Sequence, residues 1–256
     1  MQDRYVGDVG DFGKFGLLRI LSGLENDRQL KLGVVWYLYP DESHNADGKH
    51  ISYLQRDGGF RCCDEELYDK LRVLLFDDLG LIAANRKISS VEEAHLLPEG
   101  TSYYSVPLAY DVGMSHTAKI SKRAEWFAGA LAETHSSDLV FLDPDNGIEC
   151  STVTKTKPKG PKYVFWDDLD AWVGRDQSIV VYHHLNRNGS HLQQVEDMRN
   201  KMRMRFAKGF DVFAVTYRRG TSRAYFVIAA PLHRELLSQR LEEMCSSPWG
   251  QHFSFA

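Results

Sequence analysis

The sequence contains no long apolar run. Across its 256 residues the longest apolar stretches, such as 34–39, have the length of a single strand, and residues 1–10 include no apolar segment of the kind that a signal peptide needs. We therefore expect a protein that neither spans nor binds a membrane, and we predict a cytoplasmic location.

Cysteine is also scarce. Of the four cysteines, Cys62 and Cys63 are adjacent while Cys150 and Cys245 are isolated, so there is no Cys-x-x-Cys pair. This argues against a structural zinc site and a disulfide framework, and it predicts reduced thiols. The proportions of hydrophobic (43%) and charged (26%) residues argue against a disordered, collagenous or coiled-coil chain. Because no repeat or linker divides the sequence, we predict one domain over residues 1–256.

Positive charge is concentrated in one segment. The whole chain has a formal charge of −4, but residues 151–234 contain 15 Lys or Arg and 7 Asp or Glu, a balance of +8. Such a segment suits an anionic partner, and we predict nucleic acid. The alternative is a set of ordinary solvated faces. The candidate phosphate contacts lie in two predicted loops: Lys155, Lys157, Lys159, Lys162, Arg218 and Arg219.

Helical and strand patterns alternate along the chain. The predicted helices are 11–24, 65–76, 118–133, one opened by Ser190, and 232–244; the predicted strands are 33–39, 102–106, 138–142, 178–183, 211–217 and 223–229. On helix 118–133 the expected inner stripe is Ile120, Ala124, Phe127 and Leu131. The turn before residue 223 is too short for a parallel crossover, so the last two strands are antiparallel neighbours. This predicts an α/β fold: a doubly wound, mostly parallel sheet with an antiparallel C-terminal strand pair at its edge.

Two carboxylates and an amide directly follow the apolar strand 138–142. Asp143, Asp145 and Asn146 belong to the stretch Asp-Pro-Asp-Asn-Gly. In a doubly wound sheet, ligands bind beyond the carboxyl ends of the strands. A carboxylate fixed there accepts hydrogen bonds from a substrate amine or holds a metal ion. The alternative is an ordinary turn.

Three glycines spaced three residues apart lie around the start of the first predicted helix. Gly7, Gly10 and Gly13 suggest a phosphate-binding loop, but Phe15 replaces the required Ser or Thr and no strand comes before them. A nucleotide P-loop is therefore excluded. The stretch instead predicts a turn that enters a helix, with Asp8 or Asp11 near its positive end and Lys14 in its first turn.

Two further polar segments follow predicted strands. The loop 39–50, which contains Tyr39, Asp41, Asn45 and Gly48, offers carboxylates and a close-approaching glycine backbone to a nucleoside; the alternative is a plain surface loop. The pair of adjacent histidines at 183 and 184 cannot easily chelate one ion, because neighbouring strand side chains point to opposite faces. We expect one of the two to reach the site; the alternative is a core or surface position for both.

Two motifs resemble a known family. The segment 7–18, Gly-Asp-Val-Gly-Asp-Phe-Gly-Lys-Phe-Gly-Leu-Leu, resembles the first helix of the ribosomal RNA large-subunit adenine-N6 methyltransferases of the RlmJ type. Asp143-Pro144-Asp145 is similar to the Asp-Pro-Pro-Tyr motif of amino-group methyltransferases, with Asp145 in place of the second Pro and Asn146 in place of the aromatic residue. The predicted ending of the sheet is typical of class I S-adenosylmethionine-dependent methyltransferases.

The resemblance implies a Rossmann-like methyltransferase that uses S-adenosylmethionine. Its substrate would be an amino group of RNA or DNA, in chemistry like that of adenine N6. Asp143 would then be the catalytic carboxylate, with Asp145 and Asn146 beside it. The implied cofactor-binding residues are Asp11, Lys14, Tyr39, Asp41, Asn45 and Gly48.

Two other functions fit the same residues. The stretch 140–147 also resembles the strand and Asp-x-Asp loop of haloacid-dehalogenase-type phosphatases, which implies an Mg²⁺-dependent phosphohydrolase or nuclease with Asp143 as nucleophile and Asp145 as general acid. The altered Asp-Pro-Asp-Asn stretch also fits a non-catalytic nucleic-acid or protein-binding domain on a methyltransferase scaffold.

Overall fold

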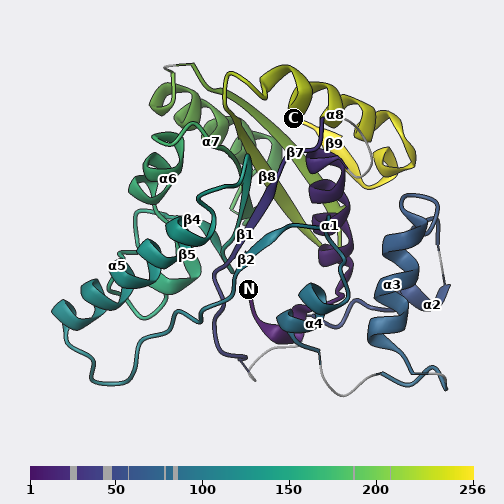
Figure 1. Cartoon of the computed structure of the whole chain (residues 1–256), viewed down its shortest axis with the longest axis horizontal. Coiled ribbons are helices and arrows are strands. Elements are labelled where there is room, and N and C mark those ends of the chain that lie inside the picture. The colour runs from purple at the N-terminus through teal and green to yellow at the C-terminus, as the bar shows by residue number, and fades with distance from the viewer. Residues whose placement is uncertain are drawn as a thin grey trace.

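The chain folds around a mixed β-sheet (Figure 1). The computed structural model describes residues 1–23, 28–42, 48–56, 58–77, 79–82, 86–186, 188–207 and 209–256. Within them the sheet has seven strands in the order β2-β1-β3-β6-β8-β7-β9. The strands are β1 (Leu32–Trp36), β2 (Ser102–Tyr104), β3 (Leu139–Asp143), β6 (Ser178–His184), β7 (Asp211–Arg219), β8 (Thr221–Ala229) and β9 (Phe253–Phe255). Strands β2, β1, β3 and β6 are parallel neighbours, whereas β8, β7 and β9 join antiparallel. Outside this sheet, β4 (Gly147–Ile148) and β5 (Tyr163–Val164) form a small parallel pair.

Helices cover both faces of the sheet. Figure 1 shows α5 (His116–Glu133), α6 (Trp166–Val173) and α7 (His191–Arg205) on one side and α1 (Val9–Ser22), α3 (Glu65–Leu75) and α8 (Arg234–Ser246) on the other. The short elements are α2 (Tyr53–Arg56), α4 (Ile88–Glu93), η1 (Asp3–Tyr5), η2 (Gly160–Lys162) and η3 (Pro248–Gln251). Two separate hydrophobic clusters, one on each face, form the core. The predicted α/β sheet with antiparallel C-terminal strands is confirmed.

The central strands are apolar because both of their faces are buried. Every residue of β1 and β3 is buried. Trp36 and Phe141 pack toward α1, while Val35 and Leu142 pack toward α5 and α6. A strand covered by helices on both sides has no solvated face, so its apolar run is continuous rather than alternating.

Two details of the prediction were wrong. The β7–β8 hairpin does not end the sheet, because β9 pairs with β7 and takes the edge. On α5, Ile120 is half exposed, and the buried residues are Arg123, Trp126 and Ala130. Of the expected stripe, Ala124 is exposed, whereas Phe127 and Leu131 are partly buried and pack against the core. The buried face is thus rotated toward Arg123, whose guanidinium lies 2.6 Å from the Asp168 carboxylate.

The glycine spacing in α1 serves close packing. A Cβ atom added at Gly10 would lie 2.1 Å from the Arg223 guanidinium, and one at Gly13 would lie 2.5 Å from the Tyr217 ring. At Gly16 it would lie 2.2 Å from the ring of Trp249. Glycine inside a helix costs about 0.5–1 kcal/mol relative to alanine, and here it lets α1 lie directly against side chains of β7, β8 and η3. This contact brings the start of α1 over the carboxyl end of β3.

None of the helices in the described part of the chain combines the length and the apolar character needed to cross a membrane.

Candidate active site

The carboxyl ends of β1, β3 and β6 lie along the same end of the sheet. Trp36, the last residue of β1, pairs with Asp143, the last residue of β3. Tyr182 near the end of β6 pairs with Tyr225 of β8. In parallel α/β sheets ligands bind beyond these carboxyl ends of the strands.

Lys14 joins the two sequence motifs. Its Nζ lies 2.8 Å from Asp11 Oδ1 and 2.8 Å from Asp143 Oδ2, and all three side chains are buried. Burial alone would lower the pKa of Lys14, but the two carboxylates raise it above its usual value. Burial raises the pKa of Asp11, against the opposing effect of Lys14. With both carboxylates ionised, the group has one negative charge in excess.

A second buried cluster lies beside the first. Lys162 Nζ lies 3.0 Å from Asp145 Oδ2 and also forms an ion pair with Glu42. Gln2 Nε2 donates to Asp145 Oδ2 at 2.8 Å. Burial would raise the pKa of Asp145, but the Met1 amino group and Lys162 hold it below its usual value. The side chains of this cluster have one negative charge in excess, and the Met1 amino group is a further cation beside them.

Met1 lies at the carboxyl ends of β1 and β3. Its α-amino nitrogen donates to the Tyr37 carbonyl at 2.8 Å and to the Asp143 carbonyl at 3.3 Å. Its own carbonyl accepts from Tyr39 N at 2.9 Å. Its thioether sulfur lies 3.6 Å from Lys14 Nζ. The described structure thus holds a methionine at the position where ligands bind in this class of sheet.

Arg223, Tyr182 and Tyr225 complete the side of the site nearest α1. Arg223 reaches the Asp8 carboxylate at 3.4 Å. Burial raises the pKa of Tyr182 and of Tyr225. The Tyr225 hydroxyl is buried and has no hydrogen-bond partner among the described residues.

The remaining predicted residues have different positions. Asp41 Oδ1 accepts from Arg4 N at 3.2 Å, and Gly48, at φ +83°, lies against the Arg4 carbonyl. The Asn146 backbone N–H donates to the Lys162 carbonyl. Asn45 lies outside the described residues.

Several contributors were not predicted. Gln2 and Met1 have no motif in the sequence, and Glu42 and Arg223 belong to polar segments whose individual contacts no local pattern specifies. The acidic character of the loop 39–50 was the one signal that pointed toward Glu42.

His183 supports the loop after β3 instead of facing the site. Its Nδ1 accepts the Ile148 N–H at 3.1 Å, and its ring lies against Gly147. Burial, aided by His184, lowers the pKa of His183 to about 4. His183 is therefore neutral at pH 7 and fixes β4 as a hydrogen-bond acceptor.

We expect the folded state to lose stability as the pH falls from 6.5 to 4. The unfolded chain protonates His183 near pH 6.5, whereas the folded chain resists protonation until about pH 4. A difference of this size corresponds to about 3 kcal/mol at pH 4, and to nothing above pH 7. Urea unfolding of the wild type and of His183→Gln at pH 7 and pH 4 measures it. His252 titrates in both proteins and cancels. An equal pH-dependent loss in the two proteins would contradict this role for His183.

The predicted phosphate contacts divide into paired and available cations. Lys162 is 5% exposed and its charge is used by Glu42 and Asp145, so in this conformation it cannot reach a phosphate. Lys155 pairs with Asp167 and Asp168. Arg219 donates from Nε to His252 Nδ1 at 2.7 Å. The exposed members are Lys157, Lys159, Arg218 and Arg219.

The carboxylates do not form a metal site in the described structure. Asp143 and Asp145 each contact a lysine, and within the residues described there is no group of three His, Cys, Asp or Glu placed to hold a metal ion. The Mg²⁺-dependent alternative thus gains no ligand set from these residues.

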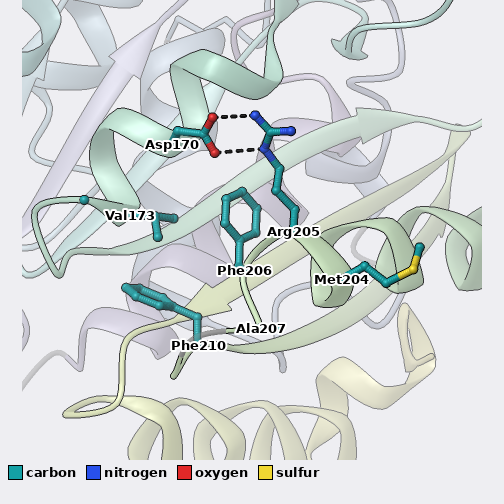
Figure 2. A pocket seen from close by; sticks show the side chains of 8 residues that line it. Asp170, Val173, Met204, Arg205, Phe206, Ala207 and Phe210 are labelled. Carbon is teal, nitrogen blue, oxygen red and sulfur yellow. Dashed lines mark hydrogen bonds and ion pairs between the residues drawn. The ribbon is translucent and has the colours of Figure 1, made fainter.

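A pocket of about 420 Å³ lies elsewhere, between α6 and the end of α7 (Figure 2). Its lining residues are Asp170, Val173, Gly174, Met204, Arg205, Phe206, Ala207 and Phe210. The Arg205 guanidinium at its rim is bonded twice to Asp170 and lies 5.7 Å from the Trp166 ring centre. The charge of the pocket is already compensated, and none of the predicted site residues lines it.

Comparison with known proteins identifies no family. No family model matches the chain, and no curated protein does. Among solved structures, the chain is similar to the crystal structure of a Legionella pneumophila protein described by the family model DUF519. The two are 13% identical with a TM-score of 0.49, and the match covers 98% of this chain and 96% of that one. A likeness at this level shows neither family nor activity.

Proposed function

We propose that the protein transfers a methyl group from S-adenosylmethionine to an exocyclic amino group of a nucleic-acid base. The sheet supports this. Four parallel strands are followed by an antiparallel hairpin whose second strand, β8, lies between β6 and β7. Such an ending is typical of the Rossmann-like fold of class I methyltransferases, and we assign the chain to that fold as part of the proposal.

The position of Met1, hereafter its seat, is defined by the Tyr37 and Asp143 carbonyls and is the main support for the proposal. The cofactor ends in a methionine, and this edge of the sheet already holds a methionine, with the Tyr37 and Asp143 carbonyls accepting from its amino nitrogen. S-adenosylmethionine is cationic at its sulfonium. The side chains of Asp11, Asp143, Asp145 and Glu42 exceed those of Lys14 and Lys162 by two negative charges, and the Met1 amino group is the cation now beside them. The two carbonyls and these carboxylates therefore suit the amino and sulfonium groups of the cofactor.

The chain's own residues supply orientation and an acceptor. When bound, S-adenosylmethionine supplies an electrophilic methyl group. Lys14 holds Asp143 through Oδ2, which leaves Oδ1 as the oxygen that can face a substrate. Oδ1 accepts a hydrogen bond from the amine, and the carbonyl of Pro144, the next residue in the chain, is the second acceptor. These bonds orient the nitrogen lone pair, and Asp143 is the nearest group to receive the proton that the amine loses.

Exposed cations support the choice of nucleic acid. Arg218 is the next-to-last residue of β7, beside the β7–β8 turn, and the start of β8 pairs with the end of β6, since Arg223 pairs with His184. This places the turn at the same edge as Asp143. Lys157 and Lys159 lie in the loop between β4 and β5. Cations at that edge suit a phosphate backbone.

Binding and transfer test the proposal. Calorimetry with S-adenosylmethionine should show saturable binding, and methyl-labelled cofactor should label unmodified RNA or DNA, with the label found by mass spectrometry on a base amino group. Absence of binding at millimolar cofactor would refute the proposal. Separate RNA, DNA and protein incubations identify the acceptor.

One observation favours a second function. Asp143 is 3% exposed, which is low for a group that must touch a substrate. A non-catalytic nucleic-acid-binding domain accounts for this directly. It predicts nucleic-acid binding that weakens with salt, together with no binding of S-adenosylmethionine.

A further inference from the structure

The first two residues are held in place by a polar clamp. Gln2 is fully buried and Met1 is 3% exposed. Gln2 Nε2 donates to Asp145 Oδ2 at 2.8 Å and to Glu42 Oε2 at 3.2 Å. Its Oε1 accepts from Glu42 N at 3.0 Å and from Arg4 Nε at 2.8 Å. The amide of Gln2 is thus satisfied at both ends, and two of its partners are carboxylates, whose hydrogen bonds are the stronger kind.

The clamp fixes Met1 at the cofactor's position. Asp145 follows β3 and Glu42 follows β1, so Gln2 ties together the two loops between which a ligand would enter. The Tyr37 and Asp143 carbonyls that accept from Met1 are then occupied. A methionine end of S-adenosylmethionine cannot use the same carbonyls while Met1 remains there.

We propose that Met1 and Gln2 form an internal competitor that must leave this seat before S-adenosylmethionine binds. The inference rests on the proposed function. Only the fraction of molecules with an open seat binds the cofactor, so the apparent affinity is lower than that of the open form. Departure of Met1 also removes its hydrogen bond to the backbone carbonyl of Asp143, the residue that carries the acceptor carboxylate.

Weakening the clamp should strengthen cofactor binding. The Gln2→Ala variant loses all four amide contacts, and we expect its dissociation constant for S-adenosylmethionine to fall by about tenfold in calorimetry. Gln239→Ala is the matched control, because Gln239 is exposed on α8 and its amide donates to Glu243 at 2.8 Å. Its dissociation constant should equal that of the wild type.

The outcomes separate the two proposals. Equal, measurable affinity for S-adenosylmethionine in the wild type and Gln2→Ala would overturn the proposal that Met1 and Gln2 compete with the cofactor. It would leave the proposed function standing. Measurable binding by the wild type that becomes about tenfold tighter in Gln2→Ala would support both. No binding by either protein would overturn the proposed function, and the competitor with it.

Methionine oxidation provides a second measurement on the unaltered chain. Met1 should resist peroxide in the free protein, as should Met202 (0% exposed), whereas Met204 (75% exposed) should be oxidised. Sinefungin, a cofactor analogue without sulfur, should make Met1 oxidisable and leave Met202 protected, as read by peptide mass spectrometry. A Met1 that stays protected in the saturated complex would overturn the competitor.

Discussion

Lys14→Met should lower the free energy of unfolding by about 3–5 kcal/mol. The substitution removes the counter-charge of two buried carboxylates, Asp11 and Asp143, and an uncompensated buried charge is among the most costly changes in a folded protein. Methionine keeps most of the side-chain volume, so the effect reports charge rather than a cavity. Urea unfolding followed by tryptophan fluorescence at pH 7 measures it.

A control and a pH series isolate the electrostatic cause. Lys201→Met, at an exposed position on α7, should change stability by no more than about 0.5 kcal/mol. The loss in Lys14→Met should shrink as the pH falls, because burial raises the pKa of Asp11 and its protonation removes one unpaired charge. The double variant Asp11→Asn with Lys14→Met should be less destabilised than Lys14→Met alone. A loss below about 1 kcal/mol at pH 7 would contradict the central role of Lys14.

Local patterns predicted the central strands and the longer helices, but not α6 or the β4–β5 pair. The continuous apolar runs at β1, β3 and β6 and the side-chain cap at Ser190 are properties of neighbouring residues, so a sequence displays them directly. The short strand β9 escaped notice because three residues carry too little pattern. The rotation of α5 was missed because Arg123 is buried by a partner, Asp168, that lies 45 residues away.

The two motifs of the site were predictable from the sequence, but their proximity in the fold was not. Lys14 and Asp143 are separated by 129 residues, and only the fold brings them to 2.8 Å. The spacing of Gly10 and Gly13 suggested a turn. Their role in packing could not be predicted, because the residues they contact, Arg223 and Tyr217, lie at the far end of the chain. A basic loop predicted that Lys162 would be exposed, whereas its charge is satisfied by acidic residues of two other loops.

These long-range contacts share one physical cause. Burying a charge is tolerated only when a partner of opposite sign lies within bonding distance, and the partner can come from any part of the chain. The nature of the buried groups was therefore visible in the sequence, while their pairing was not. The pairing also places four acidic groups, Asp11, Asp143, Asp145 and Glu42, around one seat, which composition alone did not suggest.

Asp143→Asn should slow methyl transfer by on the order of 10³-fold. Under the proposed function the carboxylate accepts the hydrogen bond from the substrate amine and then its proton, and a neutral amide does neither well. Cofactor affinity should also fall, because the substitution removes one of the negative charges that favour the cationic sulfonium, so the rate is compared at saturating cofactor. Single-turnover transfer of labelled methyl groups to the acceptor identified above measures the rate.

The other end of the same strand offers a matched control. Asp138 precedes β3, and its carboxylate accepts from Lys31 N at 2.8 Å, far from the seat. Asp138→Asn makes the same chemical change and should leave the transfer rate within about twofold of the wild type, since an amide oxygen still accepts that bond. Equal losses in the two variants would point to a general effect on folding. An Asp143→Asn protein that transfers methyl groups at the wild-type rate would remove this carboxylate from the reaction.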